Sequence, residues 1–228
     1  MPQSNDRIIA HMESQVGAWE VAGDPRAVFL SCYLLMTRNV LEAIEGGEFH
    51  DPAWVKGLME RFAAYYFVAV EAYDRSPDAA PAVWQFAHQV SLSPDSLPLQ
   101  KVLTGVNAHI NYDLVLCLAD VLAPEWGGLS DDARAARYRD HCHVNAVIGR
   151  TIDAVQDQVL EPSMPVMSLV DALFGSLDER LVSRLITNWR EEVWQNATRM
   201  LCSADPAERD AVASEVEEAA LRIGRLIA

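Results

Sequence analysis

The sequence predicts an all-α protein, a single-domain helical bundle of about eight or nine helices. Apolar residues recur with a helical period between well-marked helix starts and stops, and no segment alternates convincingly between polar and apolar residues. At 228 residues the chain is long enough for one sizeable core, so we assign residues 1–228 to one domain. No internal repeat and no low-complexity tract divides it.

Helix starts are marked along the chain by aspartate–proline pairs. Asp24, Asp51 and Asp205 each stand directly before a proline, which places a capping carboxylate beside the residue best suited to the first helical position. Ser130, followed by two aspartates, predicts a further start, and residues 176–179 predict another as a capping box. We therefore expect long helices joined by short loops.

One segment, residues 62–70 (FAAYYFVAV), has a composition that also suits a strand. It lies inside a run that begins at Asp51 and contains no turn residue except Gly57. The length of this run favours a helix, so we predict a helix through residues 62–70.

Composition excludes several classes of partner. The chain has 18 Lys and Arg against 33 Asp and Glu, and the net charge of −15 opposes binding to nucleic acid or to anionic membrane surfaces. The N-terminal segment has no signal-peptide core and no apolar run predicts a membrane span, so we expect a cytoplasmic protein. The four cysteines lack CxxC spacing, which argues against a zinc knuckle. The sequence leaves open whether the protein forms a homodimer.

The expected helix at about residues 98–122 carries four polar residues in an otherwise almost wholly apolar segment: Asn107, His109, Asn111 and Asp113. On a helix the two asparagines lie about 40° apart, as do His109 and Asp113, but the two pairs point about 200° away from each other. Apolar residues cover the remaining directions, so we predict that this helix is buried at the centre of the bundle. Each buried polar group then needs a partner, because an unpaired one costs about 1–3 kcal/mol.

His109 and Asp113 are the strongest candidates for catalytic residues. Four residues apart on a helix, they can share a proton, and Asp113 would then fix the imidazole tautomer while His109 acts as general acid or base. The same side chains could instead bind one divalent metal, with Asp140 as a further candidate ligand. A third alternative is structural, in which the polar residues form a satisfied network that holds neighbouring helices. One divalent metal and no cofactor at all are both compatible with the sequence.

Residues on several helices complete the candidate site. We assign substrate binding to Asn107, Asn111, Asn145, Arg190, Trp194 and Tyr66. Arg190 has alternatives: it can stack on Trp194 at i+4, pair with a buried aspartate, or clamp the carboxylate of a ligand.

Three strings resemble a family of bacterial proteins classed only as a domain of unknown function. They are GVNAHINYDL at 105–114, RDHCHVN at 139–145, and the R-x-x-x-W pattern from Arg190 to Trp194. The family pattern has Phe where this chain has His141, which argues against His141 as an essential ligand. The resemblance spans most of the chain and implies that polar residues of three helices form one constellation, but it implies no reaction.

His109 and Asp113 also give a looser similarity to the helical zinc-dependent phospholipases C and nucleases, whose sites use HxxxD and HxxxE pairs. The second pair is absent from this sequence, so the similarity is an analogy. No ExxH pair supports a ferritin-like di-iron site either.

These observations predict an intracellular small-molecule enzyme that uses acid–base chemistry, namely isomerisation, cyclisation or elimination of a largely apolar substrate in a biosynthetic pathway. The first alternative is a hydrolase that depends on a single metal bound by His109 and Asp113. The second is a non-catalytic helical module that binds a ligand or a partner and uses its buried polar network only to fix helix register.

Overall fold

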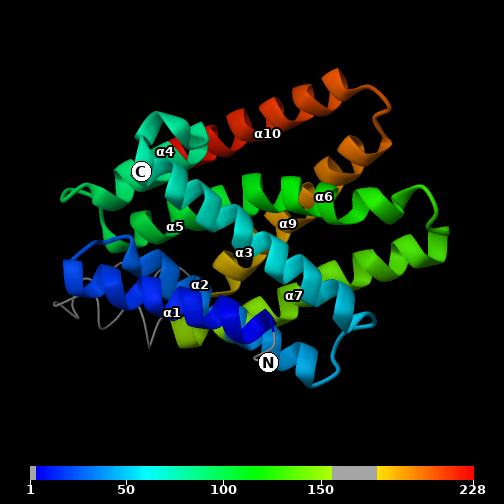
Figure 1. Ribbon diagram of the computed structural model, residues 1–228, viewed down its shortest axis with the longest axis horizontal. Helices are drawn as coiled ribbons and strands as arrows, with labels where there is room; N and C mark the ends of the chain where they lie inside the picture. The colour runs from blue at the N-terminus through cyan, green and yellow to red at the C-terminus, as the bar shows by residue number, and fades with distance from the viewer. Residues whose placement is uncertain (1–3, 156–178) are drawn as a thin grey trace.

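The computed structural model describes residues 4–155 and 179–228, and these residues are helical except for short connections (Figure 1). The α-helices are α1 (Ser4–Ala22), α2 (Ala27–Glu45), α3 (Pro52–Arg75), α4 (Ala82–Leu92), α5 (Pro98–Ala108), α6 (Leu114–Trp126), α7 (Asp131–Val155), α9 (Glu179–Cys202) and α10 (Pro206–Ile227). A 3₁₀ turn, η1 (Pro77–Ala79), and a π-helical segment, η2 (His109–Asp113), complete the described elements. The predicted all-α class is confirmed, and the segment of ambiguous composition lies within α3.

Two of the aspartate–proline pairs start helices as predicted. Asp51 accepts a hydrogen bond from the backbone N–H of Trp54 at 3.0 Å and starts α3, and Asp205 accepts from Ala207 N–H at 2.9 Å and starts α10. In both helices proline follows the cap, where its missing N–H costs nothing. The capping box predicted at 176–179 lies mostly outside the described residues.

The start of α2 differs from the prediction. Asp24 does not cap this helix, because its carboxylate accepts from the backbone N–H of Arg26 at 3.0 Å and pairs with the Arg26 guanidinium at 2.6 Å. The helix therefore begins at Ala27, after a turn. Arg26 also pairs with Asp74 at 2.6 Å, which ties the start of α2 to the end of α3.

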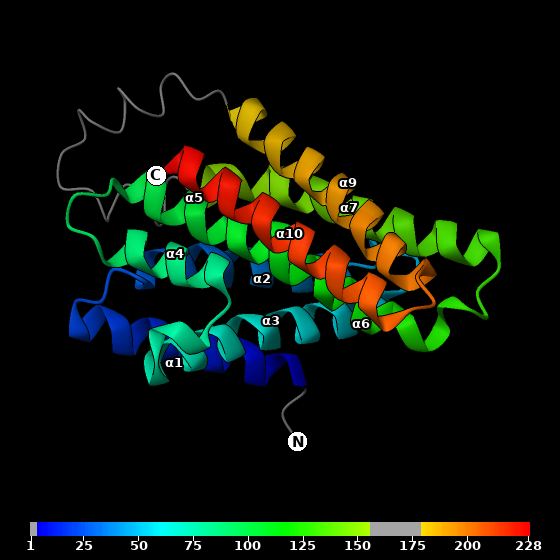
Figure 2. The ribbon, with the colours of Figure 1, turned by 90° about the horizontal axis from the view of Figure 1, so that it is seen from above.

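A continuous helix formed by α5, η2 and α6 occupies the centre of the bundle in both views (Figures 1 and 2). Figure 2 shows α9 and α10 on one side of it and α1 and α3 on the other, and the central helix packs against α2, α3, α4, α9 and α10. Its interior apolar side chains include Val102, Leu114, Val115, Leu118 and Leu122. The predicted central position is confirmed.

Two stretches, Ala27–Glu45 and Pro98–Trp126, are long and apolar enough to cross a membrane by length and composition alone. In the structure 50% and 67% of their most apolar windows are buried within the protein, and the core helix of a soluble protein meets the same criterion. The cytoplasmic location therefore stays a prediction.

Gly105 allows α5 to approach α2 closely. A Cβ atom at this position would lie 2.6 Å from Cδ2 of Phe29, well inside van der Waals contact. The Phe29 ring has little room to move, because it is buried and packs against the rings of Tyr33, Tyr66 and Trp84.

We predict that Gly105→Ala lowers the free energy of unfolding by about 1–3 kcal/mol, since the strain of overpacking exceeds the gain in helix propensity. Gly57→Ala is the matched control, because Gly57 is exposed on α3 and a Cβ there meets nothing within 4 Å. This control should be neutral or stabilising by up to about 1 kcal/mol. Urea denaturation measures both values, and equal effects of the two substitutions would contradict the prediction.

Candidate functional site

The candidate site is built around the buried carboxylate of Asp113. His109 Nδ1 lies 3.0 Å from Asp113 Oδ2, and Trp84 Nε1 on α4 lies 3.0 Å from both carboxylate oxygens. The side chains of His109 and Asp113 are only 5% and 2% exposed. The predicted contact between His109 and Asp113 is thus present. The indole of Trp84, which the sequence pattern did not identify, is a second partner of the carboxylate.

Burial shifts both titrating groups toward their uncharged forms. It lowers the pKa of His109, against the opposing effect of the Asp113 hydrogen bond, and it raises the pKa of Asp113, against the N–H donors of His109 and Trp84. Trp84 can only donate, so its indole N–H favours an accepting carboxylate. An uncharged His109 beside that carboxylate carries its proton on Nδ1, which leaves the lone pair on Nε2.

Aromatic rings enclose the imidazole of His109. The Phe62 ring stacks on it with centroids 3.6 Å apart and planes 7° apart, and the Tyr33 ring contacts it at 4.4 Å in an edge arrangement. These rings come from α3 and α2, whereas His109 itself lies at the start of the π-helical segment η2. Single-turn π segments inside α-helices occur frequently at functional sites.

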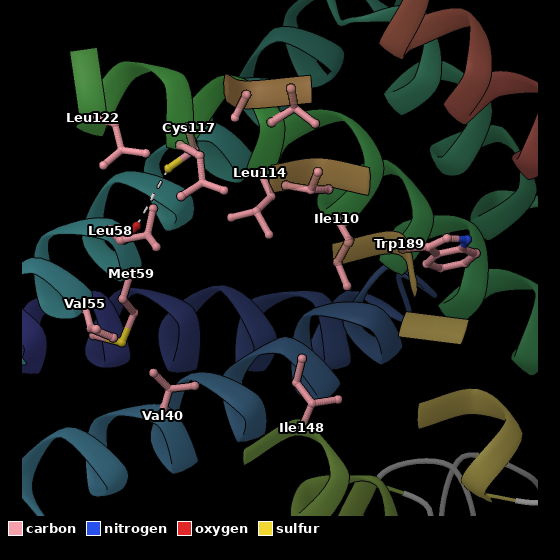
Figure 3. Close-up of a cluster of buried hydrophobic side chains, with 14 of the residues drawn as sticks. Val40, Val55, Leu58, Met59, Ile110, Leu114, Cys117, Leu122, Ile148 and Trp189 are labelled. Carbon is pink, nitrogen blue, oxygen red and sulfur yellow. Dashed lines mark hydrogen bonds between the residues drawn. The ribbon is translucent and has the colours of Figure 1, made fainter. Parts of the chain in front are cut away.

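A cavity of about 210 Å³ lies beside His109, between α2, α3, the central helix, α7 and α9. Figure 3 shows wall residues from different elements that face one another, among them Val40, Met59, Ile110, Leu114 and Ile148. Most of the wall is apolar. The described lining residues with polar side-chain groups are Cys32, Tyr33, Thr37, His109 and Arg190.

Two polar groups of this wall have no partner. His109 Nε2 and the Tyr33 hydroxyl are both buried, and neither makes a hydrogen bond of good geometry with the described residues. The Thr37 side chain lies near the Tyr33 hydroxyl, but its own hydroxyl donates to the Tyr33 carbonyl at 2.8 Å. Burial also raises the pKa of Tyr33 well above its usual value, so its hydroxyl stays protonated. Trp54 Nε1, the Tyr66 hydroxyl and His88 Nε2 are also buried without partners among the described residues, but these residues do not line the cavity. The two groups of the wall therefore combine unused hydrogen-bonding capacity with space for a ligand.

Asn107 and Asn111 lie on the opposite side of the central helix. Asn107 Nδ2 donates to the Ala220 carbonyl on α10 at 2.8 Å, and Asn111 Nδ2 donates to Asn107 Oδ1 at 2.9 Å. The two polar pairs therefore diverge as the helical geometry predicted. Neither asparagine lines the cavity, so the geometry gives them a bracing role between helices and does not support the predicted substrate contact.

Arg190 on α9 is among the residues that line the cavity. Its Nε donates to Asn145 Oδ1 at 2.7 Å, and its Nη2 donates to the His141 carbonyl at 2.7 Å. His141 in turn lies with Nε2 2.9 Å from the Arg190 carbonyl. Asn145 therefore positions Arg190 and does not itself line the cavity.

Two other predicted substrate-binding residues lie away from the cavity wall. Trp194 packs against Tyr138 and His141 with ring centroids 5.2 and 5.4 Å apart, and no stacking with Arg190 is found in the described structure. Tyr66 is fully buried in the aromatic cluster, 5.8 Å from the His109 ring. Both residues support the site through packing.

Asp140 has a structural role that explains its burial. Its two oxygens accept hydrogen bonds from the backbone N–H groups of His50 and Asp51, each at 2.8 Å, and so fix the loop that leads into α3. Within residues 4–155 and 179–228, no group of three or more His, Cys, Asp or Glu side chains is arranged to hold a metal ion. The predicted alternative of a metal centre at His109, Asp113 and Asp140 finds no support in this geometry.

The buried imidazole of His141 makes stability depend on pH. Burial and the nearby Arg190 charge lower its pKa well below the usual value of about 6.5, although its bond to the Arg190 backbone opposes this shift. Its stabilising contribution is thus present above about pH 6.5 and is lost as pH falls toward the folded pKa, because the unfolded chain then binds the extra proton.

We predict that wild type becomes less stable on acidification and that His141→Phe removes part of this dependence. Between about pH 7.5 and about pH 5, the stability of wild type should fall relative to the variant by about 2 kcal/mol. Urea denaturation at the two pH values measures this difference. Parallel pH profiles of the two proteins would show that His141 is not held uncharged.

Comparison with known proteins identifies one match. No curated protein and no solved structure matches the chain. Residues 5–228 match a family described as a family of unknown function, DUF5995, and this match covers nearly the whole chain. The chain therefore belongs to the family of unknown function DUF5995.

Proposed function

We propose that the protein is a small-molecule enzyme in which His109 transfers a proton to or from a largely apolar substrate bound in the cavity. One observation carries this proposal: the imidazole is held at one nitrogen by a carboxylate, whereas its other nitrogen is unpaired at the wall of an apolar cavity. A histidine fixed in this way can act as a general acid or base once a substrate proton comes within hydrogen-bond reach of the unpaired nitrogen.

The surroundings of His109 support its use as a base. The lowered pKa keeps the imidazole uncharged near neutral pH, with the lone pair on Nε2. When Nε2 accepts a proton, the adjacent Asp113 carboxylate stabilises the imidazolium, and Trp84 holds that carboxylate in place. Tyr33, whose hydroxyl is protonated and unpaired, can donate a hydrogen bond to a polar atom of the substrate.

The route to Nε2 is restricted. Phe62 covers one face of the ring, Asp113 occupies the Nδ1 edge, and Nε2 is itself buried. A substrate must therefore displace part of the cavity wall before it contacts Nε2. The enclosure of the ring by these groups also excludes water, which strengthens the electrostatic interactions inside the site.

The cavity limits the size and chemistry of the substrate. Its volume of about 210 Å³ exceeds that of the engineered cavity of about 150 Å³ that accepts benzene. A substrate with roughly one ring or a short aliphatic chain would fit. Among the described lining residues, His109 has the side chain best suited to exchange a proton near neutral pH, because Cys32, Tyr33 and Arg190 stay protonated there. In an apolar cavity such a group suits proton-transfer reactions best, namely isomerisation, cyclisation or elimination.

A second candidate is non-catalytic binding of an apolar molecule. The burial of Nε2 favours it, because a base that no ligand can reach performs no chemistry. In that case His109 and Asp113 would serve only to hold the central helix in place. The two candidates differ in whether a bound molecule loses a proton.

The Kemp elimination of 5-nitrobenzisoxazole tests whether His109 is a usable base. In this reaction a base removes the proton from carbon 3 while the ring N–O bond breaks, and the released phenolate absorbs visible light. We predict that wild type accelerates the reaction above buffer and that His109→Gln lowers the rate at least about tenfold. Asp113→Asn should also lower the rate, because it no longer fixes the tautomer of His109.

His88→Gln is the matched control. His88 is another buried imidazole, its pKa is lowered to about 4 by burial, and it does not line the cavity, so its replacement should leave the rate unchanged. Circular dichroism verifies the fold of each variant. 1-Octanol, which competes for the apolar cavity, should inhibit the wild-type reaction without any substitution. A wild-type rate equal to the buffer rate, or a rate insensitive to His109→Gln, would overturn the catalytic proposal.

A further inference from the structure

Arg190 gives the cavity a positive charge. Its side chain lines the cavity, yet the residue is only 5% exposed. Burial lowers the pKa of the guanidinium to about 10, so it stays charged at neutral pH. A buried charge is costly unless an opposite charge compensates it.

The described residues do not provide that compensation. Arg190 makes its hydrogen bonds to the Asn145 side-chain oxygen and to the carbonyl and ring nitrogen of His141, all of which are neutral acceptors. No carboxylate within residues 4–155 and 179–228 forms a salt bridge with it. The ion pair with Asp113 or Asp140, one of the alternatives for Arg190, is not formed, because these carboxylates accept from Trp84 and from backbone N–H groups instead.

The neutral partners hold the guanidinium in one orientation. Nε and Nη2 are both engaged, whereas Nη1 has no hydrogen-bond partner in the described part of the chain. The position of the group is thus fixed, and it retains N–H donors for one more acceptor. Guanidinium groups fixed in this way bind carboxylates with charge-assisted hydrogen bonds.

We propose that the cavity binds a monocarboxylate with a compact apolar body, and that Arg190 binds its carboxylate group. The apolar wall formed by residues such as Val40, Met59 and Ile148 would enclose the hydrocarbon part. The carboxylate supplies an opposite charge that no described residue provides to Arg190. The volume of about 210 Å³ suits a medium-chain or single-ring carboxylic acid.

This inference names the substrate class of the cavity in the proposed function, and it rests on that function only through the shared cavity. His109 and Arg190 lie on different elements, η2 and α9, and make separate contacts. Binding of a carboxylate at Arg190 can therefore be measured without any reaction at His109.

Octanoate and 1-octanol provide the test, because they share an eight-carbon chain and differ in the charged group. Isothermal titration calorimetry with the full chain should show that octanoate binds wild type at least about tenfold more tightly than 1-octanol. Arg190→Gln should abolish this preference while retaining binding of 1-octanol, which also shows that the variant is folded.

Arg199→Gln is the matched control, since Arg199 lies on the same helix but is exposed and pairs with Glu215. It should keep the full preference for octanoate. Equal binding of the two compounds to wild type, no binding of either, or a preference that survives Arg190→Gln would each overturn the inference. A failed Kemp elimination with an intact octanoate preference would overturn only the catalytic proposal.

A second measurement needs no variant. The ¹³C signal of carboxyl-labelled octanoate, followed against pH in the complex, reports the pKa of the bound acid. A guanidinium contact should lower this pKa below that of free octanoate, whereas burial among apolar side chains alone would raise it. A raised value would therefore contradict binding at Arg190, even if Arg190→Gln does not fold.

Discussion

The buried Asp113 carboxylate is the group on which the arrangement of the site depends. A carboxylate that is almost fully buried needs donors, and it obtains them from the indole of Trp84 on α4 and the imidazole of His109 one helical turn away. These contacts join α4 to the central helix and set the orientation of the imidazole. Phe62 then stacks on the oriented ring, so packing and hydrogen bonding hold His109 in the same position.

The central helix separates a bracing function from a binding function. On one side Asn107 bonds to α10 and satisfies its polar groups entirely within the protein. On the other side His109 Nε2 is unpaired in the wall of the cavity, and Arg190 brings to the same cavity a charge that no carboxylate of the described residues compensates. Buried polar atoms without a partner among the described residues also occur elsewhere in the interior, for example the Tyr66 hydroxyl and His88 Nε2. The groups at the cavity differ in having space beside them that a ligand can occupy.

The features of the fold and site that could be predicted from sequence are those set by residues close to one another in the chain. Helical periodicity predicted the central helix and the divergence of its polar pairs, since both depend only on residues near one another in the chain. The contact between Asp113 and Trp84 could not be predicted, because Trp84 lies 29 residues away in the sequence. No spacing rule identifies contacts between residues on two packed helices. For the same reason the sequence does not reveal that Asn107 bonds to α10, or which of the alternatives for Arg190 the fold adopts. The π-helical turn at His109 left no pattern in the sequence.

The tautomer of His109 is the most direct test of the proposed base, because a base at Nε2 requires an uncharged imidazole with its proton on Nδ1. Long-range ¹H–¹⁵N correlation spectra of uniformly labelled protein, with His109→Gln to assign the signals, report the protonation of each ring nitrogen. We predict that near neutral pH His109 shows a protonated Nδ1 and an unprotonated Nε2. An imidazolium at that pH, or a proton on Nε2 with Nδ1 free, would contradict the account.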